Sequence, residues 1–185
     1  MARGYSKARS ELTAQDLDDR EAAAERGTGR ISDRNKMRKD MTERFYKTAE
    51  TVRAAYEIAS EVHATQTRRD GAPYMQHVLE VADGTRSPKA RMVALLHDTM
   101  EDGGITREQM VAKGIPADVI TAVEALTRPP KSEQKMTYQE YIEQIVKPNE
   151  LARQVKIADL RSNLKNNDNP GQVKRYERAL KALLP

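Results

Sequence analysis

Apolar side chains recur every three or four positions over most of this chain, from about Thr42 onward. This period is that of one face of an α-helix, and no segment shows the sustained apolar–polar alternation of a half-buried strand. The first helix is expected to run from Thr42 to about Thr65. Its apolar positions are Phe45, Ala49, Val52, Ala55, Tyr56, Ala59 and Val62. The pattern predicts an all-α fold.

Turn residues and capping patterns divide the rest of the chain into further helices. A second helix carries the apolar residues between Val78 and Ala82, and Ser87-Pro88 begins a third. The third is apolar nearly all round, as expected of a buried central helix. Capping patterns at Thr106 and Thr137 and the proline at position 116 begin three more. Two last helices are expected over about 149–164 and 173–184.

Residues 1–38 differ from the rest, because they are rich in charge and carry few apolar side chains. Such a segment buries too little surface to offset the entropy lost on ordering. This composition favours a mobile or loosely helical arm. The alternative is an arm that orders on a second copy in a homo-oligomer. Residues 39–185 are expected to form one domain, a size that a single core supports.

The composition argues against several classes of protein. Cysteine is absent, so neither a disulfide framework nor a thiolate metal site is expected. No apolar run approaches a membrane span and the start lacks a secretory pattern, so we expect a cytoplasmic protein without a membrane partner. The net charge of +4 is small beside 32 basic and 28 acidic residues, and one Phe and no Trp leave few stacking platforms. No sequence-specific nucleic-acid partner is expected.

Two of the three histidines have the surroundings of metal ligands. His97 and Asp98 directly follow an apolar run, which should carry them inward. His77 lies earlier in the chain, and Asp159 lies later among apolar neighbours. Two imidazoles and two carboxylates suit manganese, iron or zinc better than calcium. The third histidine, His63, is expected to be structural or on the surface.

Glu101 and Asp102 each lie four positions after a member of the His97-Asp98 pair. An imidazole and three carboxylates so close together need a compensating cation, because burial and mutual repulsion would otherwise be costly. Taken singly, each residue has a structural alternative. A His-Asp pair usually ends a surface helix, a lone histidine is usually a hydrogen-bonded core residue, and Asp159 also fits a helix surface. Together they favour a metal site.

Three ordered stretches resemble the HD-domain phosphohydrolases, in particular the hydrolase domain of the RelA/SpoT homologues and the small alarmone hydrolases. They run from His63 to His77, from Ala94 to Asp102 and from Val155 to Leu164. The second contains Leu96-His97-Asp98-Thr99-Met100-Glu101-Asp102. The likeness extends over roughly 42–185. It implies an HD-domain bundle of about eight helices around a metal site.

The resemblance also implies a reaction, removal of the 3′-pyrophosphate from guanosine tetra- or pentaphosphate to give GDP or GTP. The family usually binds one Mn²⁺ ion through positions that match His77, His97, Asp98 and Asp159. Glu101 and Asp102 match the pair that activates and orients the attacking water.

The resemblance implies a small nucleotide as substrate. Arg68 matches an arginine that contacts substrate near the guanine, and Asn163 matches an asparagine of the substrate pocket. The guanidinium fork suits phosphate, so Arg68 and Arg69 are expected to neutralise the substrate's charge. Lys131 and Lys135 are expected to be ordinary solvated charges.

The chain departs from the family after Asp159. Leu160-Arg161-Ser162-Asn163 stands where the family often has Arg-Leu-His-Asn, a change that packing alone can explain. Asn166 replaces a small hydroxyl residue, which leaves the identity of the nucleotide open. The sequence ends where the long enzymes begin their synthetase domain, so we expect a stand-alone hydrolase.

Other functions remain open from the sequence. An HD-type metal site also serves hydrolases of adenosine alarmones, the 2′-phosphate of NADPH, deoxynucleoside triphosphates or cyclic nucleotides. A non-catalytic, nucleotide-binding regulator would be expected to have lost ligands or the Glu-Asp pair, and no such loss is present. A nucleic-acid module using the N-terminal arm would need more than its nearly balanced charges provide.

Overall fold

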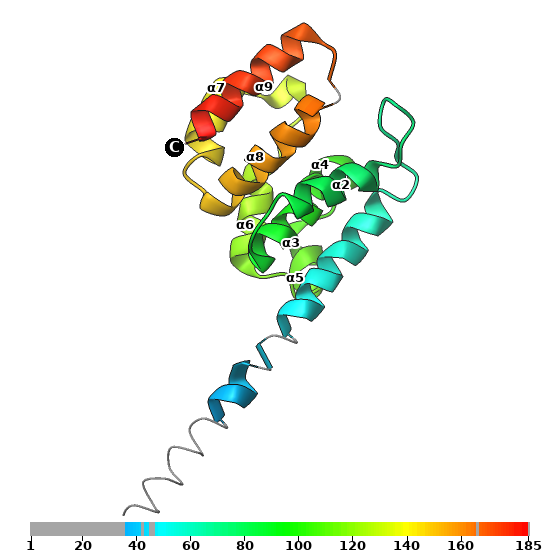
Figure 1. Cartoon of the computed structure of the whole chain (residues 1–185), viewed down its shortest axis with the longest axis vertical. Coiled ribbons are helices and arrows are strands. Elements are labelled where there is room, and N and C mark those ends of the chain that lie inside the picture. The colour runs from blue at the N-terminus through cyan, green and yellow to red at the C-terminus, as the bar shows by residue number, and fades with distance from the viewer. Residues whose placement is uncertain (1–35, 42, 45–46, 166, 185) are drawn as a thin grey trace, which may run out of the picture. The chain divides into compact units, whose positions relative to one another are not determined.

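The computed structural model describes residues 36–41, 43–44, 47–165 and 167–184 (Figure 1). The chain divides into two units, residues 1–47 and 48–185, which are described separately. The described residues of the first unit are helical and exposed. The predicted arm of residues 1–38 lies almost wholly outside the described residues, and its boundary stays a prediction.

Every regular element described in the second unit is helical, which confirms the predicted all-α class. The isolated bridge between Thr67 and Pro73 does not extend into a strand. A helix over residues 48–62 comes first. The labelled helices are α2 (Tyr74–Asp83), α3 (Pro88–Leu96), α4 (Thr99–Gly103), α5 (Arg107–Ala112), α6 (Ala117–Leu126), α7 (Tyr138–Tyr141), α8 (Glu150–Lys165) and α9 (Pro170–Leu183). A short 3₁₀ turn (Lys131–Glu133) and a π-helical turn (Ile142–Val146) complete the unit.

The helix starts that the capping patterns predicted are confirmed. Ser87 Oγ accepts the Ala90 N–H at 3.1 Å, and Pro88 occupies the first turn of α3. Complete capping boxes join Thr106 to Gln109 at α5 and Thr137 to Glu140 at α7. Each cap satisfies N–H groups that have no partner inside the helix and contributes about 0.5–2 kcal/mol.

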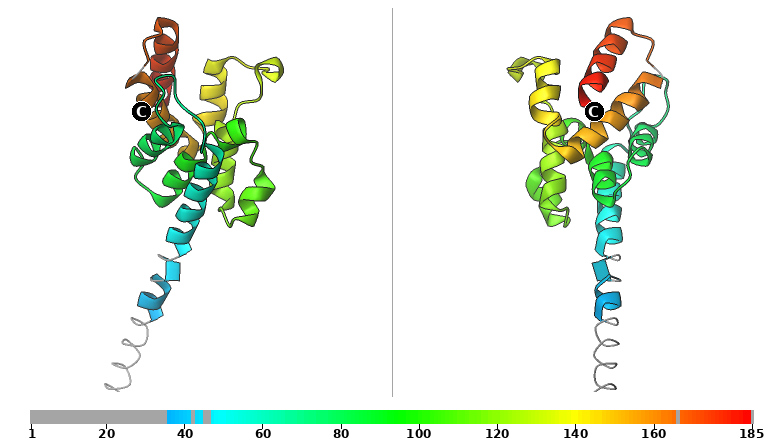
Figure 2. Two further views of the ribbon diagram at one scale, coloured as in Figure 1. Left: turned by 90° about the vertical axis from the view of Figure 1, so that its right-hand side faces the viewer. Right: turned by 60° about the vertical axis from the view of Figure 1, so that its left-hand side comes forward.

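Helix α3 lies at the centre of the unit, as its all-round apolar sequence predicts. It packs against α2, α6 and α8, and Figure 2 shows α9 alongside α8. The buried residues of α3 are Ala90, Met92, Val93, Ala94, Leu95 and Leu96. Because each large side chain contributes roughly 1.5–3 kcal/mol when buried, this helix is firmly held. Its C-terminal end therefore places His97 in the interior.

Helix α3 ends directly before His97, and a turn leads from it into α4. His97 and Asp98 form a turn between the two helices, with Asp98 as the N-cap residue of α4. The Asp102 N–H still donates to the Asp98 carbonyl at 2.8 Å, so the four-residue spacing survives the break. A Cβ at Gly103 would lie 2.5 Å from Val62 Cγ1. The missing side chain lets α4 rest against the end of the helix over 48–62.

Within the described residues, each helix is too short or too polar to reach across a lipid bilayer.

Candidate metal centre

The end of α3 leaves one nitrogen of His97 buried without a hydrogen-bond partner. The ring is 3% exposed, and its Nδ1 donates to the Ala94 carbonyl at 2.7 Å. Its Nε2 is buried and has no hydrogen-bond partner, although Asp98 Oδ2 lies 2.9 Å away outside hydrogen-bond geometry. A buried imidazole nitrogen left unpaired is costly in an apolar interior but suits a metal ligand.

His77 approaches the same point from α2. It is 3% exposed, and its ring centroid lies 5.4 Å from that of His97. Its Nδ1 contacts Ser162 Oγ at 3.1 Å, which leaves Nε2 facing the centre, 3.3 Å from Asp159 Oδ1. The two imidazoles therefore turn their Nε2 atoms toward one carboxylate.

Asp159 completes the group from α8. It is 5% exposed, and both of its oxygens are held by neighbours on the same helix. Asn163 Nδ2 donates to Oδ1 at 2.5 Å, and Lys156 Nζ donates to Oδ2 at 2.8 Å. His77, His97 and Asp159 each offer an atom within 4.8 Å of the others, so this buried group can hold a metal ion.

Asp98 lies beside this group and is more exposed, with 23% of its side chain accessible. Tyr74 donates its hydroxyl to Asp98 Oδ2 at 2.5 Å. This hydrogen bond orients the carboxylate next to His97 Nε2. Its proposed role as the fourth ligand stays a prediction.

Electrostatics in the group strongly favour charged forms. Burial alone would lower the pKa of His97, but Asp98 and Asp159, with the hydrogen bond to Ala94, raise it to about 9. Burial alone would likewise raise the pKa of Asp98, but His97 lowers it to about 2. For Asp159, Lys156 and the two histidines overcome burial and hold its pKa well below the usual range. The two carboxylates, Asp98 and Asp159, thus favour a positive charge at this point.

Manganese binding is expected to strengthen as the pH rises from 7 toward 9. In the metal-free protein a proton occupies His97 up to its pKa of about 9, and an incoming ion must displace it. Below that pKa, affinity should rise about tenfold per pH unit, with close to one proton released per ion. The stability of the metal-free protein is expected to change in the opposite direction and to fall as the pH rises. The raised pKa of His97 stabilises the folded state fully below pH 6.5, and this contribution is lost as the pH approaches 9.

Isothermal titration calorimetry with Mn²⁺, in two buffers of different ionisation enthalpy, measures both the affinity and the proton release. A dissociation constant that stays constant between pH 7 and 9 would contradict this arrangement of charges.

The predicted catalytic pair lies on α4, next to the metal group. Glu101 Oε2 accepts the backbone N–H of Arg128 at 3.3 Å, and both carboxylates are exposed. Desolvation and the negative charge of Asp98 raise the pKa of Asp102. The two side chains have the carboxylate chemistry of a proton acceptor, and their catalytic role stays a prediction.

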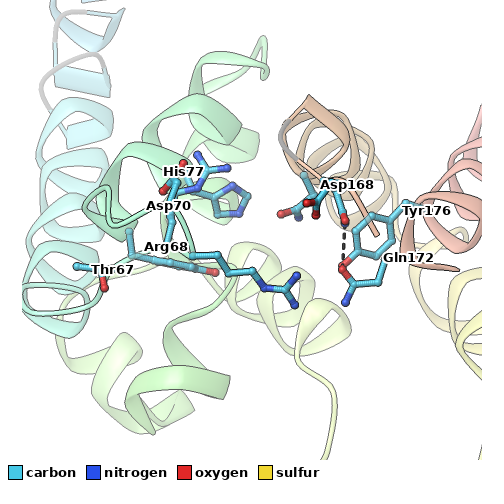
Figure 3. A pocket seen from close by; sticks show the side chains of 11 residues that line it. Thr67, Arg68, Asp70, His77, Asp168, Gln172 and Tyr176 are labelled. Carbon is cyan, nitrogen blue, oxygen red and sulfur yellow. Dashed lines mark hydrogen bonds between the residues drawn. The ribbon is translucent and has the colours of Figure 1, made fainter. Parts of the chain in front are cut away.

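A cavity of about 690 Å³ opens beside His77, and the three predicted substrate-binding residues, Arg68, Arg69 and Asn163, line it (Figure 3). Arg68 and His77 point into the cavity from one side, while Gln172 and Tyr176 face them from the other. Lys131 and Lys135 are exposed and do not line it. The prediction for Asn166 falls on a residue outside the described part of the chain.

Sequence reasoning missed several residues of the site. Tyr74 lies within the stretch from His63 to His77 but was assigned no role there. Lys156 has no visible role until the structure shows its ammonium donating to Asp159. Asn167 donates to Gln172 at 3.1 Å, and Tyr176 adds an aromatic wall to the cavity. Their polar and aromatic character was visible in the sequence, but nothing there joined them to His77. His63 is buried outside the metal group, with Nδ1 2.7 Å from Gln66 Oε1.

Comparison with known proteins finds partial relatives, while no protein-family model matches the chain. A guanosine-3′,5′-bis(diphosphate) 3′-pyrophosphohydrolase of Aquifex aeolicus is 36% identical over 102 residues, 51% of this chain and 14% of that protein. A probable GTP pyrophosphokinase of Mycobacterium leprae is 43% identical over 63 residues, 32% of this chain and 8% of that protein. The bifunctional (p)ppGpp synthase/hydrolase RelA of Mycobacterium tuberculosis is 44% identical over 54 residues, 27% of this chain and 7% of that protein.

These likenesses support an HD-type domain in this chain. In particular, they support a domain like the hydrolase domain of RelA/SpoT enzymes. The matched stretches span only a small part of each relative's length. The relatives' names cover both hydrolysis and synthesis.

Proposed function

We propose that the protein is a metal-dependent hydrolase that removes pyrophosphate from the 3′ position of (p)ppGpp. One observation carries the proposal. His77 belongs both to the buried metal group and to the lining of the cavity that holds Arg68, Arg69 and Asn163. A phosphorylated nucleotide held by the arginines would therefore have phosphate next to the metal ligands.

Manganese is the proposed ion, held by His77, His97, Asp98 and Asp159. The unpaired Nε2 of His97 is the feature that fits it best. An ion at these ligands would polarise a phosphoryl oxygen and acidify water. The donor set also suits iron or zinc, so manganese rests on the resemblance rather than on geometry.

The chain's own side chains would carry the remaining steps. Arg68 and Arg69 neutralise and orient the phosphates. The oxygen of a water molecule bonds to the nearer phosphorus of the 3′-pyrophosphate, and the bond from that phosphorus to the ribose 3′ oxygen breaks. Asp102, assisted by Glu101, accepts the proton of the water. A proton returns to the 3′ oxygen, and GDP or GTP leaves with pyrophosphate as the second product. The proposed setting is the cytoplasm.

The test is pyrophosphate release from guanosine tetraphosphate by the full chain with added Mn²⁺. Turnover should disappear on chelation and in Asp98→Ala, while Asp83→Ala, on an exposed carboxylate of α2, should retain it. Manganese binding without turnover would reject the substrate and direct the assay to adenosine alarmones, NADPH and deoxynucleoside triphosphates. Absence of both binding and turnover would reject the function.

A further inference from the structure

A buried hydroxyl lies between the metal ligand His77 and an acidic side chain. Ser162 on α8 is 3% exposed. Its Oγ lies 3.1 Å from His77 Nδ1 and donates to Glu80 Oε2 at 2.7 Å. His77 and Glu80 lie on α2, and Ser162 on α8 is more than eighty positions from either of them in the sequence. These contacts form a continuous hydrogen-bonded chain that ends at the metal group.

The direction of the protons along this chain follows from its acidic end. A carboxylate has no proton to give, so Ser162 donates its only proton to Glu80. The Ser162 oxygen is then an acceptor, and His77 Nδ1 must be the donor. A neutral imidazole with its proton on Nδ1 has a lone pair on Nε2. That nitrogen is the one that faces Asp159.

Glu80 is itself held from the cavity side. Arg68 Nη1 lies 3.8 Å from Glu80 Oε2, the same oxygen that accepts the hydrogen bond of Ser162. The Arg68 side chain is 14% exposed. Because Arg68 also lines the cavity, the chain of contacts reaches from the proposed nucleotide pocket to the metal ligand. Ser162 stands where the resembled family often has His, a difference that packing alone could explain from the sequence. The structure shows that Ser162 contacts both His77 and Glu80.

We propose that Glu80 and Ser162 are positioning residues that fix the ring and tautomer of His77 and thereby set the affinity of the metal site. The inference rests on the proposed metal site but not on the identity of the substrate. Partners of this kind around a ligating histidine typically change metal affinity by ten- to a hundredfold when removed.

The experiment measures Mn²⁺ affinity by calorimetry for the full chain and its variants. Ser162→Ala should weaken binding about ten- to a hundredfold, and Ser162→Thr, which keeps the hydroxyl, should largely restore it. Ser60→Ala is the matched control, because Ser60 Oγ is a buried helical hydroxyl without a hydrogen-bond partner. The double variant Glu80→Ala/Ser162→Ala should lose little more Mn²⁺ affinity than either single variant, because both residues act through the same hydrogen-bonded chain.

Affinity within twofold of the wild type in Ser162→Ala, with unchanged thermal stability, would overturn the proposal. The wild-type protein supplies a second measurement should the variants fail to fold. Its three histidines give a simple spectrum after ¹⁵N labelling, with assignment aided by His63→Gln. The proposal expects the neutral His77 ring to carry its proton on Nδ1, and a proton on Nε2 would refute it.

Failure of this proposal and failure of the proposed function are separable. If Mn²⁺ affinity depends on Ser162 but the protein leaves guanosine tetraphosphate intact, the role of the hydrogen-bonded chain is supported and the proposed substrate is rejected. If turnover needs Mn²⁺ but Mn²⁺ affinity is the same without the Ser162 hydroxyl, the proposed function is supported and the role of Ser162 is rejected.

Discussion

Replacing Lys156 with methionine is expected to lower the free energy of unfolding of the metal-free protein by about 3–5 kcal/mol. Lys156 Nζ donates to Asp159 Oδ2 at 2.8 Å, and 16% and 7% of the two side chains are exposed. Asp159 in turn raises the pKa of Lys156 against the effect of burial. Methionine keeps most of the volume but leaves a buried carboxylate without its main cation. Denaturant unfolding in the presence of a chelator measures the loss.

Manganese should partly restore the stability of Lys156→Met. An ion bound by Asp159 supplies the positive charge that the variant lacks, and a hundredfold excess over the dissociation constant stabilises a folded protein by about 2.7 kcal/mol. Lys174→Met, at an exposed position on α9, is the matched control and should change stability by less than about 0.5 kcal/mol. A loss in Lys156→Met no greater than in this control would show that the pair is not a stabilising one.

Features set by near neighbours in the sequence could be predicted. The caps at Ser87, Thr106 and Thr137 depend on residues three positions away, and the structure has all three. The burial of α3 could be predicted because apolar residues lie on nearly all faces of this helix. These features need no knowledge of tertiary contacts, so periodicity and capping chemistry suffice for them.

Features that depend on distant contacts could not be predicted. Whether the helix continues past His97-Asp98 could not be decided from the sequence, because the four-residue spacing through Asp102 fits both a continuous helix and a turn. The contact of Ser162 with Glu80 joins α8 to α2, and no local rule pairs them. The π-helical turn Ile142–Val146 follows a correctly predicted cap and resembles an ordinary helix in sequence. The ion pair of Lys156 with Asp159 is the exception, because residues three positions apart on a helix are neighbours and their opposite charges could have predicted it.

Removing either carboxylate of α4 is expected to lower turnover far more than it lowers metal affinity. Asp102 has a pKa raised by desolvation and by the charge of Asp98, which moves it toward the range where a proton acceptor works best at neutral pH. Glu101 is oriented by the backbone N–H of Arg128. Loss of a positioned acid or base typically lowers kcat by about 10²–10⁴-fold.

Asp102→Asn and Glu101→Gln test these roles with nearly unchanged shape. Each should lower kcat for pyrophosphate release by about 10²–10⁴-fold. Mn²⁺ affinity should change little, because neither residue belongs to the group formed by His77, His97 and Asp159. Glu108→Gln, on an exposed side chain of α5, is the control and should retain full turnover. Parallel losses of turnover and Mn²⁺ affinity in Asp102→Asn would instead place this carboxylate among the metal ligands. Turnover within twofold of the wild type in both variants would contradict a catalytic role for these two carboxylates.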